Sequence, residues 1–144
     1  MKRQYAIPVA IVALAGTTAC TDPLVADWAL TGAIVEGSVQ ELEYSETRLG
    51  TVYDTSFVGT LEITDGMQAK LEMEVTYAMT YANGDTEAVE YSYAHEGQVT
   101  PGAGKGLYEI NLDDLGHFDC TLSNRSTELN CVDTDAEIEL QFDS

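Results

Sequence analysis

Apolar side chains recur at odd-numbered positions through residues 57–93, and the even positions between them carry mainly Thr, Glu, Ser, Gln and Lys. Because successive side chains of a strand point to opposite faces, this period of two predicts strands with one buried and one solvent face. Glu87 is the exception on the apolar face. The apolar positions are Phe57, Leu61, Ile63, Met67, Leu71, Met73, Val75, Tyr77, Met79, Tyr81, Val89, Tyr91 and Tyr93.

Two glycine-containing segments divide this region into hairpins. A two-residue turn at Asn83-Gly84 would set odd residues opposite even ones and mix the two faces of the sheet. Three-residue loops at Thr64-Asp65-Gly66 and Ala82-Asn83-Gly84 keep odd residues opposite odd ones. They also put Gly third, where the backbone must be left-handed. The pattern therefore predicts these two loops.

Shorter alternating runs fill the C-terminal third of the chain. Pairing Cys120 with Cys131 also pairs Leu122 with Leu129, so the cysteines and the apolar faces agree on one register. We expect a cross-strand disulfide there, which suits an oxidising compartment and contributes about 2–3 kcal/mol. The alternating positions are Tyr108, Ile110 and Leu112, then Phe118, Cys120 and Leu122, then Leu129 and Cys131, then Ala136, Ile138, Leu140 and Phe142.

Together these patterns predict an all-β chain of about eight to ten antiparallel strands. Weaker patterns predict strands around residues 25–31, 34–44 and 51–54, a loop at 101–106, and no long amphipathic helix in the mature chain. A meander with one apolar face must close on itself or pack against a second sheet. A closed up-and-down barrel of about eight strands fits the length best.

The first twenty residues have the composition of an export signal. Lys2 and Arg3 precede an apolar run over residues 6–15, and small residues then lead to Cys20. The segment resembles a bacterial lipoprotein signal, which implies removal of residues 1–19 and acylation of Cys20 at the start of one domain, residues 20–144. Plain secretion with cleavage after Ala19 is the alternative. The odd number of cysteines favours lipidation, since Cys20 has no partner once the other two pair.

The mature chain is strongly acidic. Loss of Lys2 and Arg3 leaves four basic residues against 25 acidic ones, a formal charge of −21. This charge argues against nucleic acid as a partner. The acidic residues are spread along the chain, which fits a saline habitat, simple solubility or a basic protein partner.

The mature start, residues 22–30 with Trp28, resembles the opening of small bacterial lipocalin-like lipoproteins, which begin with a Gly-x-Trp strand soon after the lipid cysteine. The strand ladder and the cysteine hairpin are similar in layout. The resemblance implies a lipocalin-like barrel that binds a small apolar ligand without catalysis. The alternative for the candidate lining residues is a plain core; they are Trp28, Met73, Val75, Tyr77, Met79, Tyr81, Val89, Tyr91 and Tyr93.

Other chemistry is weakly indicated. Residues 113–119 hold three Asp and His117, and Asp133 with Asp135 is similar to part of a calcium loop, but neither has the full ligand pattern. Neither His95 nor His117 belongs to a recognisable nucleophile arrangement. We therefore expect surface carboxylates, and neither a metal site, a cofactor nor an enzyme.

Two functions follow from these patterns. The first is a monomeric, lipid-anchored protein of the bacterial envelope, more specifically of the outer membrane at its periplasmic face or at the cell surface, whose barrel binds a small apolar ligand. Thr21, with Asp22 one position later, favours the outer membrane by its resemblance to lipoproteins forwarded there. The second is an acidic envelope module with a solid core and no ligand, which docks a basic protein.

Overall fold

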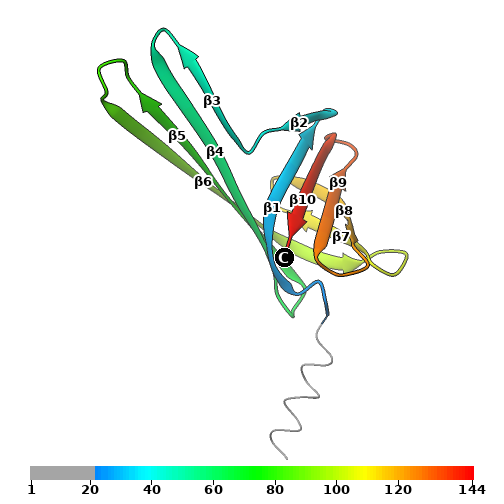
Figure 1. The fold of residues 1–144 in the computed structure, drawn as a ribbon. Helices are drawn as coiled ribbons and strands as arrows, with labels where there is room; N and C mark the ends of the chain where they lie inside the picture. The colour runs from blue at the N-terminus through cyan, green and yellow to red at the C-terminus, as the bar shows by residue number, and fades with distance from the viewer. Residues whose placement is uncertain (1–21) are drawn as a thin grey trace, which may run out of the picture.

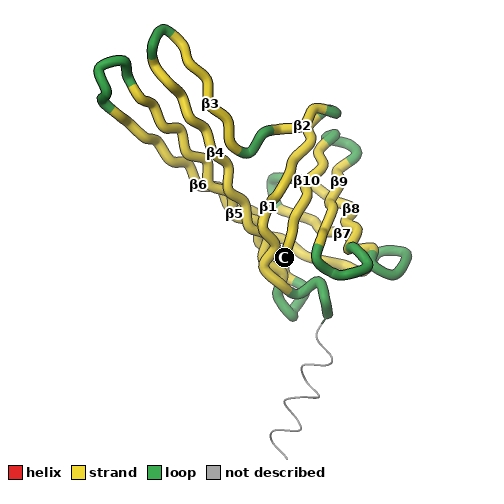
Figure 2. Tube along the Cα trace, in the orientation of Figure 1, coloured by secondary structure: helices red, strands yellow, loops and turns green. Residues whose placement is uncertain are grey.

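The computed structural model describes residues 22–144 as ten antiparallel strands in one continuous sheet (Figures 1 and 2). The signal segment and Cys20 lie outside the described residues. Within the described part of the chain, no helix is long and apolar enough to cross a membrane. The strands are β1 (Ala26–Val35), β2 (Ser38–Gln40), β3 (Glu43–Arg48), β4 (Thr51–Ile63), β5 (Gln68–Thr80), β6 (Thr86–Pro101), β7 (Leu107–Leu112), β8 (Gly116–Leu122), β9 (Glu128–Asp133) and β10 (Ile138–Asp143).

Eight of these strands close into a barrel, as the alternation predicts. The strands β4 to β10 follow one another in the sheet, β10 pairs with β1, and β1 pairs with β4 from Ala26 opposite Ile63 to Ala29 opposite Thr60. Closure buries the inward positions of every strand, among them Trp28, Phe118 and Phe142. The Trp28 indole Nε1 donates a hydrogen bond to the Leu24 carbonyl oxygen at 2.9 Å, so its polar atom is satisfied inside the core.

The long strands β4, β5 and β6 run past the barrel and form a separate flat projection (Figure 1). β4 changes neighbour along its length, because β3 pairs with it up to Ser56 and β1 takes over from Thr60. On the other side, β7 pairs with β6 from Gly97 onward. We call the projection, residues 43–58 and 74–94 with the loop 81–85 at its tip, the wing.

The predicted hairpin loops are confirmed in one case and wrong in the other. Ala82-Asn83-Gly84 is a three-residue loop in which Tyr81 and Asp85 are hydrogen-bonded and Gly84 has a φ of +91°, as predicted. The first loop is Asp65-Gly66-Met67, one residue later than predicted, and Met67 has the left-handed φ of +56°. Odd residues still oppose odd ones, so the error shifts the register by two and keeps the apolar face intact.

The prediction of one strand over residues 34–44 is wrong. β1 continues to Val35, and a tight turn with positive φ at Glu36 and Gly37 leads into the short β2. β3 begins after a two-residue connector. The predicted strand at 51–54 is the start of the longer β4.

The cysteine hairpin has the predicted register. Cys120 lies opposite Cys131 and Leu122 opposite Leu129, and the two cysteines form a disulfide. Both cysteines are buried on the inner face of the barrel. The bridge therefore ties β8 to β9 at the core.

Candidate functional site

The barrel interior is filled by its own side chains. The space among Leu61, Phe118, Leu140 and their neighbours is about 10 Å³, at or below the room that a single water molecule needs. The described core therefore has no room there for an organic ligand.

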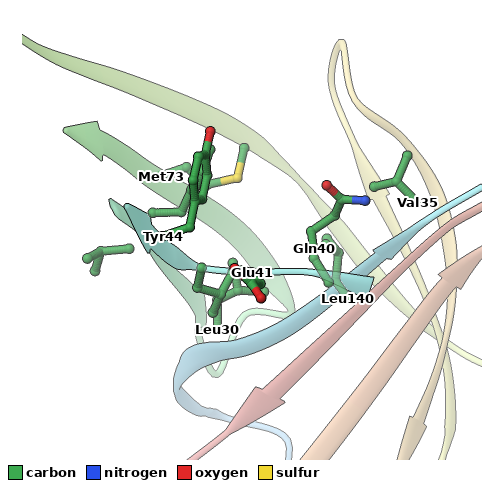
Figure 3. Close-up of a pocket in the computed structure, with 11 residues that line it drawn as sticks. Leu30, Val35, Gln40, Glu41, Tyr44, Met73 and Leu140 are labelled. Atoms are coloured by element: carbon green, nitrogen blue, oxygen red, sulfur yellow. The ribbon is translucent and has the colours of Figure 1, made fainter. Parts of the chain in front are cut away.

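A larger apolar space lies where the wing leaves the barrel. It has a volume of about 500 Å³. Figure 3 shows Met73 and Tyr44 on its wing side and Val35, Gln40 and Leu140 on its barrel side. We call this space the fork pocket. Its lining residues are Leu30, Ala33, Val35, Gln40, Glu41, Leu42, Tyr44, Phe57, Val58, Met73 and Leu140.

An irregularity in β1 supplies one wall of the fork pocket. The pairing of β1 with β10 shifts between Leu30 and Gly32, so Leu30 faces Phe142 while Ala33 faces Leu140. The inward face of β1 thus changes from even to odd residues, as a β-bulge does. The shift turns Ala33 and Val35 toward the pocket, which a regular strand would have turned outward.

A glycine in β4 keeps the floor of the fork pocket close to β1. A Cβ at Gly59 would lie 3.0 Å from the Cβ and Cδ2 atoms of Leu30, tighter than an ordinary contact. Without that side chain, Leu30 packs directly over the strand. Gly59 sits between Thr60, where β1 leaves β4, and Ser56, where β3 joins it.

The chemistry of the fork pocket is that of an apolar binding site with a polar rim. Its walls are mostly aliphatic and aromatic, and Met73 adds an adaptable thioether. Gln40 and Glu41, both exposed, stand at its edge. Such a site suits an apolar body with a neutral or cationic polar group, because a carboxylate at the rim repels an anion.

Of the nine candidate lining residues, Met73 lines the fork pocket. Trp28 lies in the barrel core, and Val75 is buried at the base of the wing. The others lie along the apolar face of the wing: Tyr77, Met79, Tyr81, Val89, Tyr91 and Tyr93.

The wing exposes its aromatic face to solvent. Tyr91 is 48% exposed and Tyr93 50%, although they lie on the face that continues into the barrel core. Tyr77 and Tyr91 pack edge to face with ring centroids 5.9 Å apart. In the described residues, no element covers this face as the opposite wall covers the barrel interior.

The structure accounts for Glu87, the charged residue on the apolar face. The Tyr81 hydroxyl donates a hydrogen bond to Glu87 Oε2 at 2.8 Å near the tip of the wing. This hydrogen bond, followed by desolvation and the charge of Glu87, raises the pKa of the Tyr81 phenol. Glu87 therefore has a polar partner on an otherwise apolar surface.

The acidic residues near His117 form a looser group than the sequence suggested. Glu109, His117 and Asp119 each place one ligand atom within 4.8 Å of the others, and all three are exposed on the outside of the barrel. His117 Nε2 lies 3.6 Å from Asp119 Oδ1. Asp113 lines the same polar cleft as Glu109 and His117, and its carbonyl oxygen lies 3.0 Å from His95 Nδ1 on β6.

The acidic pair at the end of β9, Asp133 and Asp135, has a structural role. Asp133 Oδ1 accepts hydrogen bonds from the backbone N–H groups of Asp135 and Ala136. Asp133 is buried, and a Cβ at Gly116 would overlap its Oδ2. These contacts shape the turn between β9 and β10.

Most of the fork-pocket residues carry no signal in the sequence. Leu30, Ala33 and Val35 line the same wall of the fork pocket because β1 contains a bulge. The pattern of apolar residues does not predict this bulge. Phe57, Met73 and Leu140 belong to the alternating apolar positions, but nothing in the sequence indicates that they meet in one pocket. Comparisons with protein-family models, curated proteins and solved structures found no match to this chain.

Proposed function

We propose that this protein is a lipid-anchored, non-catalytic protein of the bacterial envelope that binds a small apolar ligand in the fork pocket. The observation that carries the binding proposal is the contrast between two spaces. The gap in the barrel core among Leu61, Phe118 and Leu140 holds about 10 Å³, whereas the apolar fork pocket offers about 500 Å³, within the range of about 300–1,000 Å³ that small-molecule sites occupy.

The membrane anchor rests on the signal pattern and on Cys20. Asp22, two residues later, is held to the barrel: its Oδ1 accepts hydrogen bonds from the Leu24 N–H and, at 3.3 Å, from the Tyr108 hydroxyl. β1 begins at the end of β4 opposite to the wing. A lipid on Cys20 would thus hold that end of the barrel at the membrane, with the fork pocket and wing directed away from it.

Binding can be tested with N-phenyl-1-naphthylamine, an uncharged apolar dye that the acidic surface does not repel. We expect its fluorescence to rise on binding, and Ala33→Phe, which fills the fork pocket, to weaken binding at least tenfold. Ala29→Phe is the matched control, because Ala29 is exposed on the outside of the same strand. Equal binding by the two variants, or no binding by the unaltered protein, would overturn the proposal.

The anchor has its own test. Mass spectrometry of the protein purified from bacterial membranes should show a mature chain that begins at Cys20 and carries acyl groups. Cys20→Ser should shift the protein from the membrane fraction to the soluble fraction or leave the signal uncleaved. An unacylated N-terminus in the unaltered protein would contradict the anchor and leave the ligand proposal standing.

The filled barrel interior favours a second candidate, the acidic module that docks a basic protein. Under that function the native protein would carry no co-purifying lipid and would retain a basic protein in low salt, releasing it in high salt. A lipid extract of the native protein separates the two functions. An apolar molecule in the extract that Ala33→Phe removes supports the ligand.

A further inference from the structure

Both edges of the wing are open: β3, which is short and half charged, ends the sheet on one side, and the longer β6 borders the other. β6 pairs with β5 along its whole length, but β7 joins it only from Gly97 onward, with one more hydrogen bond from the Asp113 N–H to the Glu96 carbonyl. No described strand pairs with residues 86–94 on the side away from β5. Such an edge is a template for another strand.

Whether a residue of β6 has an odd or an even number tells to which side its backbone N–H and carbonyl groups point. Asp85 and Val99 bond to the β5 side, whereas the Glu96 carbonyl bonds to β7 on the opposite side. Backbone groups of successive residues alternate in direction along a strand. The even residues from Thr86 to Ala94 therefore present free N–H and carbonyl groups outward, while the odd residues carry the exposed aromatic side chains.

The edge is complementary to itself. A two-fold pairing centred on Tyr91 sets Ala88 opposite Ala94, and so covers the open edge from residue 88 to residue 94, up to the Glu96 carbonyl that Asp113 occupies. It sets Tyr91 opposite Tyr91 of the second copy and Val89 opposite Tyr93. No like charges oppose each other, and the aromatic face continues across the junction. A pairing centred on Glu90 would set two Glu90 carboxylates face to face.

We propose that two copies of this protein associate through β6, antiparallel about Tyr91, to join their wings into one continuous sheet. The even residues form the hydrogen-bonded pairs, and the odd residues form the closer non-hydrogen-bonded pairs, where the aromatic side chains meet. This two-fold interface uses the same surface on both copies. It does not depend on the fork pocket holding a ligand, and it differs from the monomer that the sequence favoured. Because the two β6 strands run antiparallel, the two barrels lie at opposite ends of the joined sheet, so a pair of this kind does not form between copies anchored side by side in one membrane.

Charge sets the conditions for this association. Each mature chain carries −21, so the two copies repel each other in dilute buffer and this repulsion is screened over about 3 Å in 1 M salt. We therefore expect sedimentation velocity of the purified protein, carrying Cys20→Ser, to show more dimer in 1 M NaCl than in 50 mM NaCl. Ser92→Pro should weaken the association at least tenfold. The Ser92 N–H points away from β5, so the wing itself loses no hydrogen bond.

The register is tested by cross-linking. Tyr91→Cys places two thiols across the two-fold axis in a non-hydrogen-bonded pair, within reach of a disulfide, so oxidation should yield a covalent dimer. Tyr77→Cys is the matched control. Tyr77 is 41% exposed, against 48% for Tyr91, but it lies on β5, which has strand neighbours on both sides.

Three results would overturn the proposal. They are a monomer at every salt concentration up to about 100 µM protein, equal cross-linking at positions 77 and 91, or a different protein bound along β6 of a monomeric chain. Circular dichroism of Ser92→Pro should match the unaltered protein. If that variant unfolds, the cross-linking pair decides the question alone.

Discussion

The barrel and the wing share the strands β4, β5 and β6, which have the same alternation of apolar and polar residues in both regions. The apolar face of these strands is buried in the barrel and exposed in the wing. In the barrel, β7 to β10 stand opposite and bury residues such as Phe118. In the wing, the same face of β5 and β6 leaves Tyr91 about half exposed. The apolar pattern thus identifies the face that a strand can bury. That face is buried only where other strands of the barrel pack against it.

Strand length explains the difference. β5 has 13 residues and β6 has 16, whereas β7 and β10 have six each. At about 3.3 Å per residue, a six-residue strand covers about 20 Å and a 13-residue strand about 43 Å. The short strands can face only one half of the long ones, and the other half projects as the wing.

The largest expected difference is between truncations in the two regions. Phe118→Ala should lower the free energy of unfolding by about 3–5 kcal/mol, because it leaves a cavity in a filled core. Tyr91→Ala should cost about 1 kcal/mol or less, since it removes an exposed cross-strand contact. Urea unfolding followed by the fluorescence of Trp28, the one tryptophan, measures both. Equal losses in dilute, low-salt buffer would mean that the wing face is buried.

Removal of the disulfide should cost nearly as much. The bridge joins residues 11 apart, and closure of a loop of that size contributes about 3 kcal/mol. The Cys120→Ala/Cys131→Ala protein should therefore unfold at lower urea. Its hydrogen exchange should rise in β8 and β9 and stay unchanged in the wing. Faster exchange in the wing as well would show that the two regions unfold as one unit.

A substitution at the junction of wing and barrel should have an intermediate effect. A Cβ at Gly97 would overlap the carbonyl oxygen of Asn111 in β7, so Gly97→Ala should force the strands apart at a cost of about 1–3 kcal/mol. Gly66→Ala is the control, because its Cβ would make an ordinary contact with Thr64. The control should change the free energy of unfolding by about 0.5 kcal/mol or less. No loss in Gly97→Ala would mean that β6 and β7 are not packed there.

The smallest effect compares two tyrosines. Hydrogen bonding to Glu87 is the main cause of the raised pKa of Tyr81 in the wing, whereas burial is the main cause for Tyr108 in the barrel, with Asp22 second. Glu87→Gln should therefore return the Tyr81 pKa toward 10.0. Asp22→Asn should leave the part of the rise at Tyr108 that burial causes. NMR titration of the two rings measures both, and a full return of the Tyr108 pKa in Asp22→Asn would reverse the assignment.

The same shifts fix the direction of the pH dependence. A phenol whose pKa is higher in the folded than in the unfolded protein stabilises the fold below the unfolded pKa of 10.0. That stability is lost as the pH rises through the folded value. Replacement of Tyr108 by Phe should therefore make unfolding less sensitive to pH above 10.

The sequence alone predicted the all-β class, the faces of the strands, the loop at 82–84 and the Cys120–Cys131 register. These features depend on neighbouring residues, because a period of two and a glycine at a left-handed position act locally. Met67 shows the limit. A non-glycine residue took the left-handed position of the first hairpin, and the register moved by two.

Tertiary structure decided where the apolar face is covered and where it is open. The bulge after Leu30 and the exchange of β1 for β3 beside β4 create the fork pocket. The short strands opposite the long ones leave one edge of β6 open over residues 86–94. Each depends on strands far apart in the chain, so no local pattern encodes it. Tyr91 and Phe118 are both aromatic residues at alternating apolar positions. Phe118 is buried because barrel strands pack opposite it, and Tyr91 is exposed because none does.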